Sequence, residues 1–351
     1  MLTGEYAQLY GELQRRMARG GDLSPGPTDT EGRFRRGVRW EGREDLHQTV
    51  LERFIAANRD RPQGGQAVLM TAGAPGAGKS TAQDNLVRWQ REDPDLGRHL
   101  ASAHGLDIKD YVVLDPDLFK RALFEGAGLP AMDPGSMALP FGRELAPAEM
   151  SGLLHREASF LRDQFEEWAR DGGYNLLYDA TLANEAVGAQ LLSGLAQDGY
   201  DQRVILSVEV PVDVSLAQNA DRWLKGRLAY EQGTDRYGGR MSPEGMIHAL
   251  YGKTTTGQGH SIGRENARKL AERGLATGLI TTDRGSFTRT APATTVPAST
   301  ATFQRGDTTV GIAAAGRLRS PRGAATGTAP PTRTPAPRLP GQTPPAPGRT
   351  R

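Results

Sequence analysis

A short apolar run that breaks into a glycine-rich turn constrains this chain more than any other feature. Residues 67–72 are apolar enough to form a buried strand, and a polar stretch with a helical pattern follows at 81–91. Between them the sequence GAPGAGKS satisfies the pattern G-x-x-x-x-G-K-[ST], from Gly73 to Ser80. A strand before this pattern and a helix after it are the context of a phosphate-binding loop, with a plain glycine-rich turn as the alternative.

Each part of such a loop has a role in binding a triphosphate. Glycines let consecutive backbone N–H groups turn inward around a phosphate, where side chains would clash. The helix that follows directs its unpaired N–H groups and positive dipole end toward the same anion. Lys79 adds charge for the β- and γ-phosphates, and the Ser80 hydroxyl can ligate Mg²⁺. We therefore expect a nucleoside triphosphate site formed by Gly73, Ala74, Pro75, Gly76, Ala77, Gly78, Lys79, Ser80 and Thr81.

Predicted strands and helices alternate after this loop. Because strands that alternate with helices around a phosphate loop form layered domains, we expect an α/β, P-loop kinase-like fold with a mostly parallel central sheet. Further strands are predicted at 111–114, 175–178, 203–210 and 279–282, and helices at 81–91, 147–170, 184–197, 212–228 and 264–273.

The N-terminal part of the chain predicts two more helices. Apolar residues at three- and four-residue spacing indicate an amphipathic helix over 6–17, which ends at Gly20-Gly21. A second helix over 46–57 leads through Arg61-Pro62 into the first strand. We expect the helix over 6–17 to pack on the sheet.

The C-terminal part has a different composition. From residue 291 onward the chain holds eleven of its 23 prolines and eight arginines, but one acid, Asp307. Such a stretch cannot bury enough apolar surface to offset chain entropy, so we predict a disordered tail. The expected divisions are an N-terminal helical extension at 1–42, a kinase domain at 43–285 and the tail at 286–351.

The distribution of charge argues against a nucleic-acid-binding domain. The segment from residue 291 carries +7, so the first 290 residues carry −5 of the net +2. A basic pI that comes from the tail gives the folded part no support as a nucleic-acid binder. Weak binding of an anionic surface by the tail, or a plain solvated chain end, remain open.

Other classes of site and location are excluded or expected from simple counts. The chain has no cysteine, which excludes disulfides, thiolate zinc sites and cysteine nucleophiles. The six histidines do not group at metal-ligand spacing. No apolar run approaches the roughly 18 residues of a membrane helix. The first residues lack the basic-then-apolar order of a signal peptide, so we expect a cytoplasmic protein without a membrane partner.

Carboxylates follow two of the predicted strands. Asp115 and Asp117 end the second strand, with Lys120 three residues later, and Asp179 and Thr181 follow the third. Because ligands bind beyond the carboxyl ends of parallel strands, these residues are expected near the γ-phosphate. A phosphotransferase needs an acid there to orient and deprotonate the acceptor hydroxyl. The alternative is that Asp115-Pro116-Asp117 only opens a turn or caps a helix.

A basic, glycine-rich stretch at 225–240 predicts a mobile lid that carries arginines onto the transferring phosphate. Arginine suits this role because its planar fork binds phosphate oxygens in pairs and stays charged. A solvated charged loop is the alternative.

In their order and spacing these motifs resemble the zeta-toxin family of P-loop kinases, the toxin halves of bacterial toxin–antitoxin pairs. The resemblance covers roughly residues 45–285. Arg227 and Arg240 stand thirteen positions apart, the spacing that the family shows between its two phosphate-binding arginines. The matching pieces are 73–80, 112–120, 173–181, Arg227 and Arg240-Met241-Ser242-Pro243.

The resemblance implies an ATP-dependent kinase. Family members phosphorylate a sugar hydroxyl of UDP-N-acetylglucosamine and so block cell-wall synthesis; relatives act on other nucleotide sugars or dinucleotides. Lys79 and Ser80 would serve ATP and Mg²⁺, and Asp117 would be the general base. Arg227 and Arg240 would stabilise charge on the γ-phosphate. An antitoxin protein is the implied partner.

The resemblance also implies residues for the acceptor. Asp179, which is glutamate in well-studied members, and Thr181 would bind metal-bound phosphate or substrate. The substrate-contacting acid on the helix before Asp179 is either Glu157 or Asp163. Glu157 borders the apolar stripe of that helix whereas Asp163 points away, so we favour Glu157. The expected substrate-binding set is Asp115, Lys120, Glu157, Asp163, Asp179 and Thr181, with Ser80 and Asp179 as metal ligands.

Two other functions remain open. One is a P-loop kinase with a different acceptor, such as a dinucleotide, an antibiotic or a polynucleotide 5′-hydroxyl. The other is an ATP-dependent switch or adaptor without kinase activity, which signals through the arginine-rich tail. In the family an antitoxin helix blocks the ATP cleft. The helix over 6–17 could do so within this chain, although we favour packing on the sheet.

Overall fold

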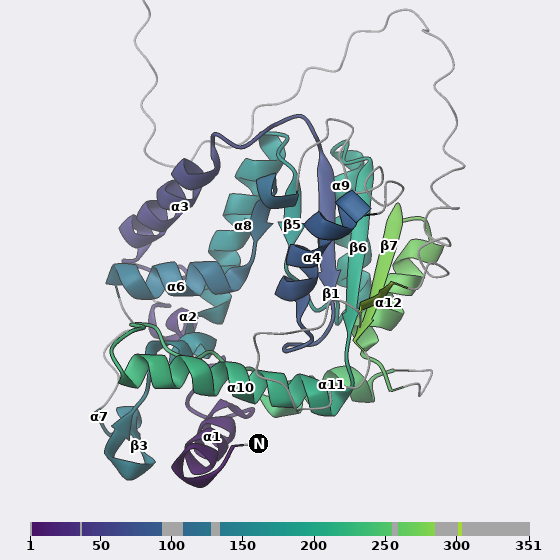
Figure 1. Cartoon of the computed structure of the whole chain (residues 1–351). Helices are drawn as coiled ribbons and strands as arrows, with labels where there is room; N and C mark the ends of the chain where they lie inside the picture. Colours follow the sequence, from purple (N-terminus) through teal and green to yellow (C-terminus); the bar gives the residue numbers. More distant parts are fainter. Residues whose placement is uncertain are drawn as a thin grey trace, which may run out of the picture. The chain divides into compact units, whose positions relative to one another are not determined.

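A sheet of six strands forms the centre of the described structure (Figure 1). In this computed structural model the described residues are 2–35, 37–92, 108–127, 134–254, 259–284 and 301–303. The strands lie in the order β2-β5-β1-β6-β7-β8, and the first five of these run parallel. The α/β class with a mostly parallel sheet is therefore confirmed. The strands are β1 (Ala67–Ala72), β2 (Val112–Leu114), β5 (Leu176–Tyr178), β6 (Gln202–Glu209), β7 (Gly278–Arg284) and β8 (Ala301–Phe303).

The five predicted strands are all present, with ends within two residues of those expected. The sixth strand, β8, lies inside the segment predicted to be disordered and pairs antiparallel with β7. That prediction is wrong at these three residues, because the edge of β7 offers unpaired backbone groups to a strand. The rest of the predicted tail, 286–300 and 304–351, lies outside the described residues.

Successive residues of β1 enter different apolar clusters, because side chains alternate across a strand. Val68 and Met70 pack with one set of helices, and Ala67 and Leu69 pack with another. The first face is covered by α3 (Glu44–Asn58), α6 (Pro116–Ala127), α8 (His155–Asp171), α9 (Glu185–Gln197) and α12 (Ile262–Glu272), and the second by α4 (Lys79–Glu92) and the 3₁₀ helix η1 (Ile108–Asp110).

Two predicted elements differ in the structure. The helix expected over 147–170 is a 3₁₀ helix, η3 (Pro147–Leu154), followed by α8. 3₁₀ segments are frequent where an α-helix begins, and the carboxylate of Glu149 accepts a hydrogen bond from Ala146 N at 2.7 Å at the start of this one. The stretch expected to form a lid, 225–240, is partly helical, because its first seven residues complete α10 (Val212–Glu231).

The N-terminal helix is confirmed as α1 (Gly4–Met17), but its expected packing on the sheet is wrong. Its buried residues Leu9 and Leu13 lie in a cluster with Trp223 of α10, because helices already cover both faces of the sheet. Figure 1 shows α1 beside α10. The remaining elements are α2 (Thr30–Arg33), α7 (Pro134–Met137), β3 (Ala138–Leu139), η2 (Pro140–Gly142), β4 (Arg143–Glu144) and α11 (Glu244–Gly252).

Within the described part of the chain, no helix combines the length and the apolar character needed to cross a membrane.

Candidate active site

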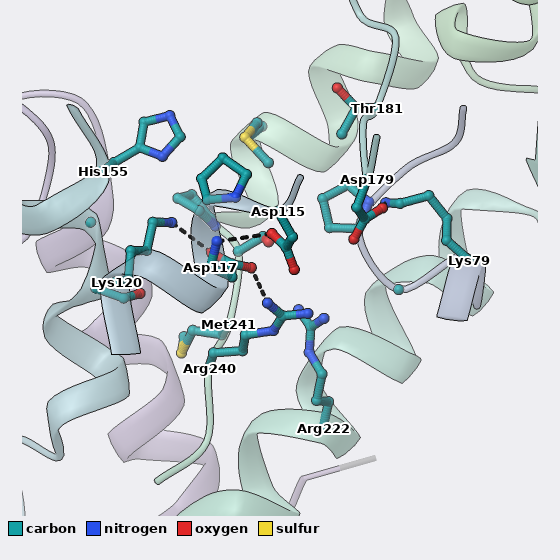
Figure 2. A pocket seen from close by; sticks show the side chains of 18 of the residues that line it. Lys79, Asp115, Asp117, Lys120, His155, Asp179, Thr181, Arg222, Arg240 and Met241 are labelled. Carbon is teal, nitrogen blue, oxygen red and sulfur yellow. Dashed lines mark hydrogen bonds and ion pairs between the residues drawn. The ribbon is translucent and has the colours of Figure 1, made fainter. Parts of the chain in front are cut away.

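A cleft of about 660 Å³ opens beyond the carboxyl ends of β1, β2 and β5. It brings the phosphate loop together with the strand-end residues that the sequence analysis singled out (Figure 2). Its described lining includes Pro75, Gly76, Gly78, Lys79, Ser80, Thr81, Asp115, Asp117, Lys120, His155, Asp179, Thr181, Arg222 and Arg240.

Glycines shape the phosphate loop for two separate reasons. Gly73 and Gly76 have φ of 141° and 83°, which side-chain-bearing residues rarely adopt. A Cβ would also lie 2.3 Å from Val208 O at Gly73, and 2.4 Å from Ser215 O at Gly76. The Ser215 hydroxyl donates to Pro75 O at 2.7 Å, which fixes the loop against α10. The loop is therefore held open as an anion cradle by the fold itself.

Lys79, the first residue of α4, lies where β1 and β5 end. Its Nζ donates to Gly73 O at 3.3 Å and lies 3.8 Å from Asp179 Oδ1. Asp179 also accepts a hydrogen bond from the Thr71 hydroxyl at 2.9 Å. Burial lowers the pKa of Lys79, although the charge of Asp179 opposes this shift. A triphosphate would replace these long contacts with closer anionic partners.

Asp115 both caps a helix and lines the cleft. Its Oδ1 accepts a hydrogen bond from Asp117 N at 2.8 Å, at the start of α6. The capping interpretation is therefore correct, but it does not exclude a place in the site. Burial, together with the charges of Asp117 and Asp179, raises the pKa of Asp115 to about 6.

Asp117 is held as a carboxylate by two cations. Lys120 Nζ donates to its Oδ1 at 2.8 Å, and Arg240 pairs with its Oδ2 (Figure 2). Burial would raise its pKa, but the charges of Lys120 and Arg240 outweigh burial and lower the pKa to about 2. Asp117 is therefore ionised at any physiological pH, in the same cleft as Lys79.

The arginine that accompanies Arg240 is Arg222, which the sequence analysis did not single out. Figure 2 shows their side chains together beside Asp117. Arg222 Nη2 donates to Asn219 Oδ1 at 3.1 Å, whereas its Nε is buried without a hydrogen-bond partner among the described residues. Burial and the charge of Arg240 lower its pKa to about 10. The sequence did hold a signal for Arg222. It stands seven residues after Ser215 and so lies on the same face of α10, the face that contacts the phosphate loop.

Arg227 does not reach the cleft and serves the fold. It is 2% exposed and has three acceptors in place of a phosphate. Its Nη1 donates to Glu149 Oε2 at 2.9 Å and to Glu144 O at 2.8 Å, and its Nε donates to Glu231 Oε1 at 2.7 Å. Arg227 lies five positions after Arg222, so the two side chains leave the helix in different directions. The thirteen-residue spacing between Arg227 and Arg240 does not reveal this difference.

Neither proposed acid on α8 lines the cleft. The Glu157 carboxylate is 0% exposed and accepts hydrogen bonds from Arg43 Nε and His47 Nε2, both at 2.6 Å. Asp163 has a 61% exposed side chain and pairs with Arg162 at 2.7 Å. His155 lines the cleft instead. It is the first residue of α8, and Glu157, two positions later, is turned toward α3.

The segment that carries Arg240 is anchored to α10 and to the N-terminal helix. Asn219 accepts from Ser242 N and donates to Ser242 O, both at 2.9 Å. Gln14 of α1 donates to Ser242 O at 3.3 Å and accepts from Glu244 N at 2.8 Å. Helix α1 thus helps to hold the backbone that places Arg240 beside Asp117.

The residues present fit a magnesium–triphosphate complex. The phosphate loop keeps a glycine backbone that side chains would displace, because a Cβ at Gly73 or Gly76 would meet Val208 O or Ser215 O. Among the described residues, no three His, Asp or Glu side chains form a metal cluster. Mg²⁺ does not need one, because it is usually held by one or two protein oxygens together with substrate phosphates. Ser80 and Asp179 can supply such oxygens at the edge of the loop.

Comparison with known proteins points to one family. Residues 97–256 match the sequence model of the zeta toxin family. No protein of curated function matches the chain.

Solved structures match the chain at low sequence identity and with TM-scores below 0.5. One is from the PezAT chromosomal toxin–antitoxin system of Streptococcus pneumoniae, with 15% identity and a TM-score of 0.44; the match covers 78% of this chain and 95% of that chain. Another is AvrRxo1-ORF1:AvrRxo1-ORF2 with sulphate ions, with 18% identity, a TM-score of 0.45 and coverage of 75% and 70%. The same pair with ATP gives 16% identity, a TM-score of 0.44 and coverage of 75% and 69%.

The matched residues include Asp117, Asp179 and Arg240, which carry the resemblance seen in the sequence and lie in one cleft. Over residues 97–256, which make up less than half of its length, the chain is similar to the zeta-toxin family.

Proposed function

We propose that this protein is an ATP-dependent kinase that transfers the γ-phosphate to an alcohol, with a sugar hydroxyl of a nucleotide sugar such as UDP-N-acetylglucosamine as the acceptor. The observation that carries the proposal is the shared cleft of Lys79 and Asp117. A phosphate-binding lysine and an ionised carboxylate on the same side of the sheet are what alcohol phosphorylation requires. Had Asp117 lain on the opposite face, the cleft could hold a nucleotide but not activate an acceptor.

In the proposed reaction the acceptor oxygen attacks the γ-phosphorus in line, and the bond from that phosphorus to the β,γ-bridging oxygen breaks, releasing ADP. Asp117 accepts the hydroxyl proton. Since its pKa is about 2, it would orient the hydroxyl first and take the proton late, as the new bond forms. Ser80 and Asp179 would hold Mg²⁺, which neutralises charge on the phosphates.

Lys79, Arg222 and Arg240 would stabilise the charge that develops on the transferring group. Their positions around Asp117 support this role. We substitute Arg222 for Arg227 in the proposal, because Arg227 is buried in ion pairs away from the cleft. Asp115, Lys120 and Thr181 line the same cleft and remain proposed substrate contacts.

Phosphorylation of a cell-wall precursor would make the protein toxic to its host, and an antitoxin protein would be its partner. The similarity of residues 97–256 to the zeta-toxin family supports both statements. Blocking of the cleft by α1 receives no support, because α1 packs on α10 and its last residue, Met17, lines the wall of a cleft that stays open.

A transfer assay with γ-labelled ATP tests the proposal. UDP-N-acetylglucosamine, NAD and a single-stranded oligonucleotide with a free 5′-hydroxyl are offered in parallel, with water as the acceptor control. The proposal expects label on the nucleotide sugar and its loss in Lys79→Ala. Label on another acceptor would keep the kinase and replace the acceptor. ATP hydrolysis without a labelled acceptor would support the switch alternative.

A further inference from the structure

The N-terminal segment lies on the His155 side of the cleft, because Leu23 O packs against Gly152 of η3, three residues before His155. Met17, Leu23 and Pro25 line the cleft together with Ser151, Gly152 and His155. Figure 2 places His155 and Lys120 on one side of Asp117, and Lys79 and Asp179 on the other. The side of Asp117 opposite the phosphate loop is where an acceptor must lie for in-line attack. Residues 17–25 come well before 97–256, the part that matches the family.

This segment is fixed in place by contacts that do not depend on a ligand. A Cβ on Gly152 would lie 2.6 Å from Leu23 O, so the segment packs directly on η3. The Asp29 carboxylate accepts from Gly26 N at 3.1 Å and from Gly32 N at 2.8 Å, which holds the turn after Pro25. The wall is therefore a built part of the cleft.

The chemistry of this end differs from that of the phosphate end. The acids in the described lining are Asp115, Asp117 and Asp179, and all three follow strands at the transfer edge. The N-terminal segment adds the apolar side chains of Met17, Leu23 and Pro25 to the lining, and η3 and α8 add Ser151, Gly152 and His155. Burial and the charge of Lys120 lower the pKa of His155, which keeps its imidazole neutral at pH 7.

Such a wall discriminates between acceptor classes. A polycationic acceptor would need carboxylates, and the described lining of this end has none. Thioether and aliphatic side chains with a few polar groups suit a flat, uncharged ring, which can contact methionine sulfur and still hydrogen-bond at its edge.

We infer that residues 17–25 form the specificity wall of the acceptor site, and that they contact an uncharged heterocyclic ring joined to the alcohol that is phosphorylated. The inference rests on the proposed function and names the acceptor class within it. It assigns a substrate-contacting role to the N-terminal extension, with Pro25 as its exposed member.

Charge-paired variants of Pro25 test this assignment in the full-length protein. Pro25→Asp and Pro25→Lys each put a charge against the proposed ring, and both should raise the acceptor KM about tenfold, a larger change than in the KM for ATP. Pro27→Asp and Pro27→Lys are matched controls, because Pro27 is also exposed but does not line the cleft, and they should leave acceptor KM unchanged. UDP-N-acetylglucosamine, uridine and adenosine serve as acceptors.

The direction in which Pro25→Asp and Pro25→Lys change the acceptor KM identifies which part of the acceptor contacts residues 17–25. If Pro25→Lys lowers the acceptor KM while Pro25→Asp raises it, an anionic group occupies this end and the ring assignment is overturned. If neither variant differs from its Pro27 control, the segment does not contact the acceptor.

A second measurement separates failure of this inference from failure of the proposed function. Absence of transfer by the wild-type protein contradicts the kinase alone. Calorimetric titration of uridine and adenosine, with a non-hydrolysable ATP analogue bound, then reports on the wall without any reaction. Weaker binding by Met17→Ala than by Leu13→Ala, which removes a buried side chain of the same helix outside the cleft, supports the wall. Equal binding by the two variants, or no binding by the wild-type protein, overturns it.

Discussion

Two arginines on α10, five residues apart, show how the same side chain can serve the fold or the site. Arg227 is 2% exposed, and the fold supplies its acceptors, chiefly the buried carboxylate of Glu149. Arg222 points into the cleft beside Arg240, with a buried Nε that has no hydrogen-bond partner among the described residues. One guanidinium is satisfied by its own protein, and the other is left for a ligand.

A buried arginine to which the fold supplies three acceptors, like Arg227, stabilises the native state. A buried arginine with an N–H group that lacks an acceptor among the described residues, like Arg222, destabilises the native state and is ready to bind an anion. Placing Arg222 next to Arg240 in a partly buried cleft costs folding free energy, which an incoming phosphate can offset. The predictions below follow from this contrast.

Removal of Arg227 should have the largest effect, and it should be on stability. Arg227→Met leaves the Glu149 carboxylate buried, with Trp223 Nε1 and Ala146 N but no cation, so we expect the free energy of unfolding to fall by about 3–5 kcal/mol. Urea denaturation measures the change. Arg227→Met combined with Glu149→Leu removes both charges and should recover most of the loss. A stable single variant with abolished phosphoryl transfer would instead place Arg227 in the reaction.

Removal of Arg222 should affect turnover rather than stability. Arg222→Ala deletes a donor aimed at the transferring phosphate, so kcat should fall by about 10²–10³-fold. The free energy of unfolding should stay within about 1 kcal/mol of the wild-type value or rise. Lys225→Ala, on an exposed position of the same helix, is the matched control for charge and should leave kcat unchanged. Equal turnover in Arg222→Ala and Lys225→Ala would show that Arg222 does not act on the transferring phosphate.

Asp115 extends the contrast to carboxylates. Its pKa is about 6 in the folded protein against a usual value of 3.8, so the folded state holds its proton more tightly. Stability should therefore fall as pH rises from about 4 to about 6. Asp115→Asn removes this destabilising charge but keeps an oxygen for Asp117 N. We expect it to raise the free energy of unfolding at pH 8 by roughly 2–3 kcal/mol.

The pH dependence supplies the control for Asp115. The stability difference between Asp115→Asn and the wild-type protein should shrink as pH falls toward 4 in parallel urea titrations. A difference that does not depend on pH would mean that the carboxylate ionises with an ordinary pKa. The ionised carboxylate of Asp115 would then cost the folded state little free energy, contrary to what the comparison of the two arginines implies.

The smallest expected effect is at Gln14, which acts on the site through backbone. Its amide holds Ser242 O and Glu244 N, and so the segment that presents Arg240. Gln14→Ala should lower kcat about tenfold with little change in ATP KM, since two neutral hydrogen bonds contribute roughly 0.5–1.5 kcal/mol each. Gln8→Ala, on the exposed face of α1, should have no effect. A rise in ATP KM at constant kcat would show that α1 serves nucleotide binding instead.

Much of the fold could be predicted because its signals are local. The strand at Ala67–Ala72 and the loop to Ser80 follow from hydrophobic pattern and glycine chemistry within a few residues. The strand-end rule then brought Asp115, Asp117 and Asp179 to the same edge, where they now lie in one cleft with Lys79.

What the sequence could not supply depends on contacts between distant elements. The favoured acid Glu157 borders the apolar stripe of its helix, but only the folded chain reveals that Arg43 and His47 occupy its carboxylate. Likewise the amphipathic pattern of α1 predicts a helix with one buried face, not that α10 rather than the sheet would cover it. Spacing to Arg240 could not distinguish Arg222 from Arg227 for the same reason.

The central claim is that Asp117 activates an alcohol for attack on a phosphate held by the loop around Lys79. Single-turnover transfer of the γ-phosphate from ATP to UDP-N-acetylglucosamine, measured for the wild-type protein and Asp117→Asn, tests it most directly. The account predicts transfer by the wild-type protein and a rate lower by about 10²–10⁴-fold in Asp117→Asn, with ATP binding retained. A near-normal rate in Asp117→Asn would contradict it.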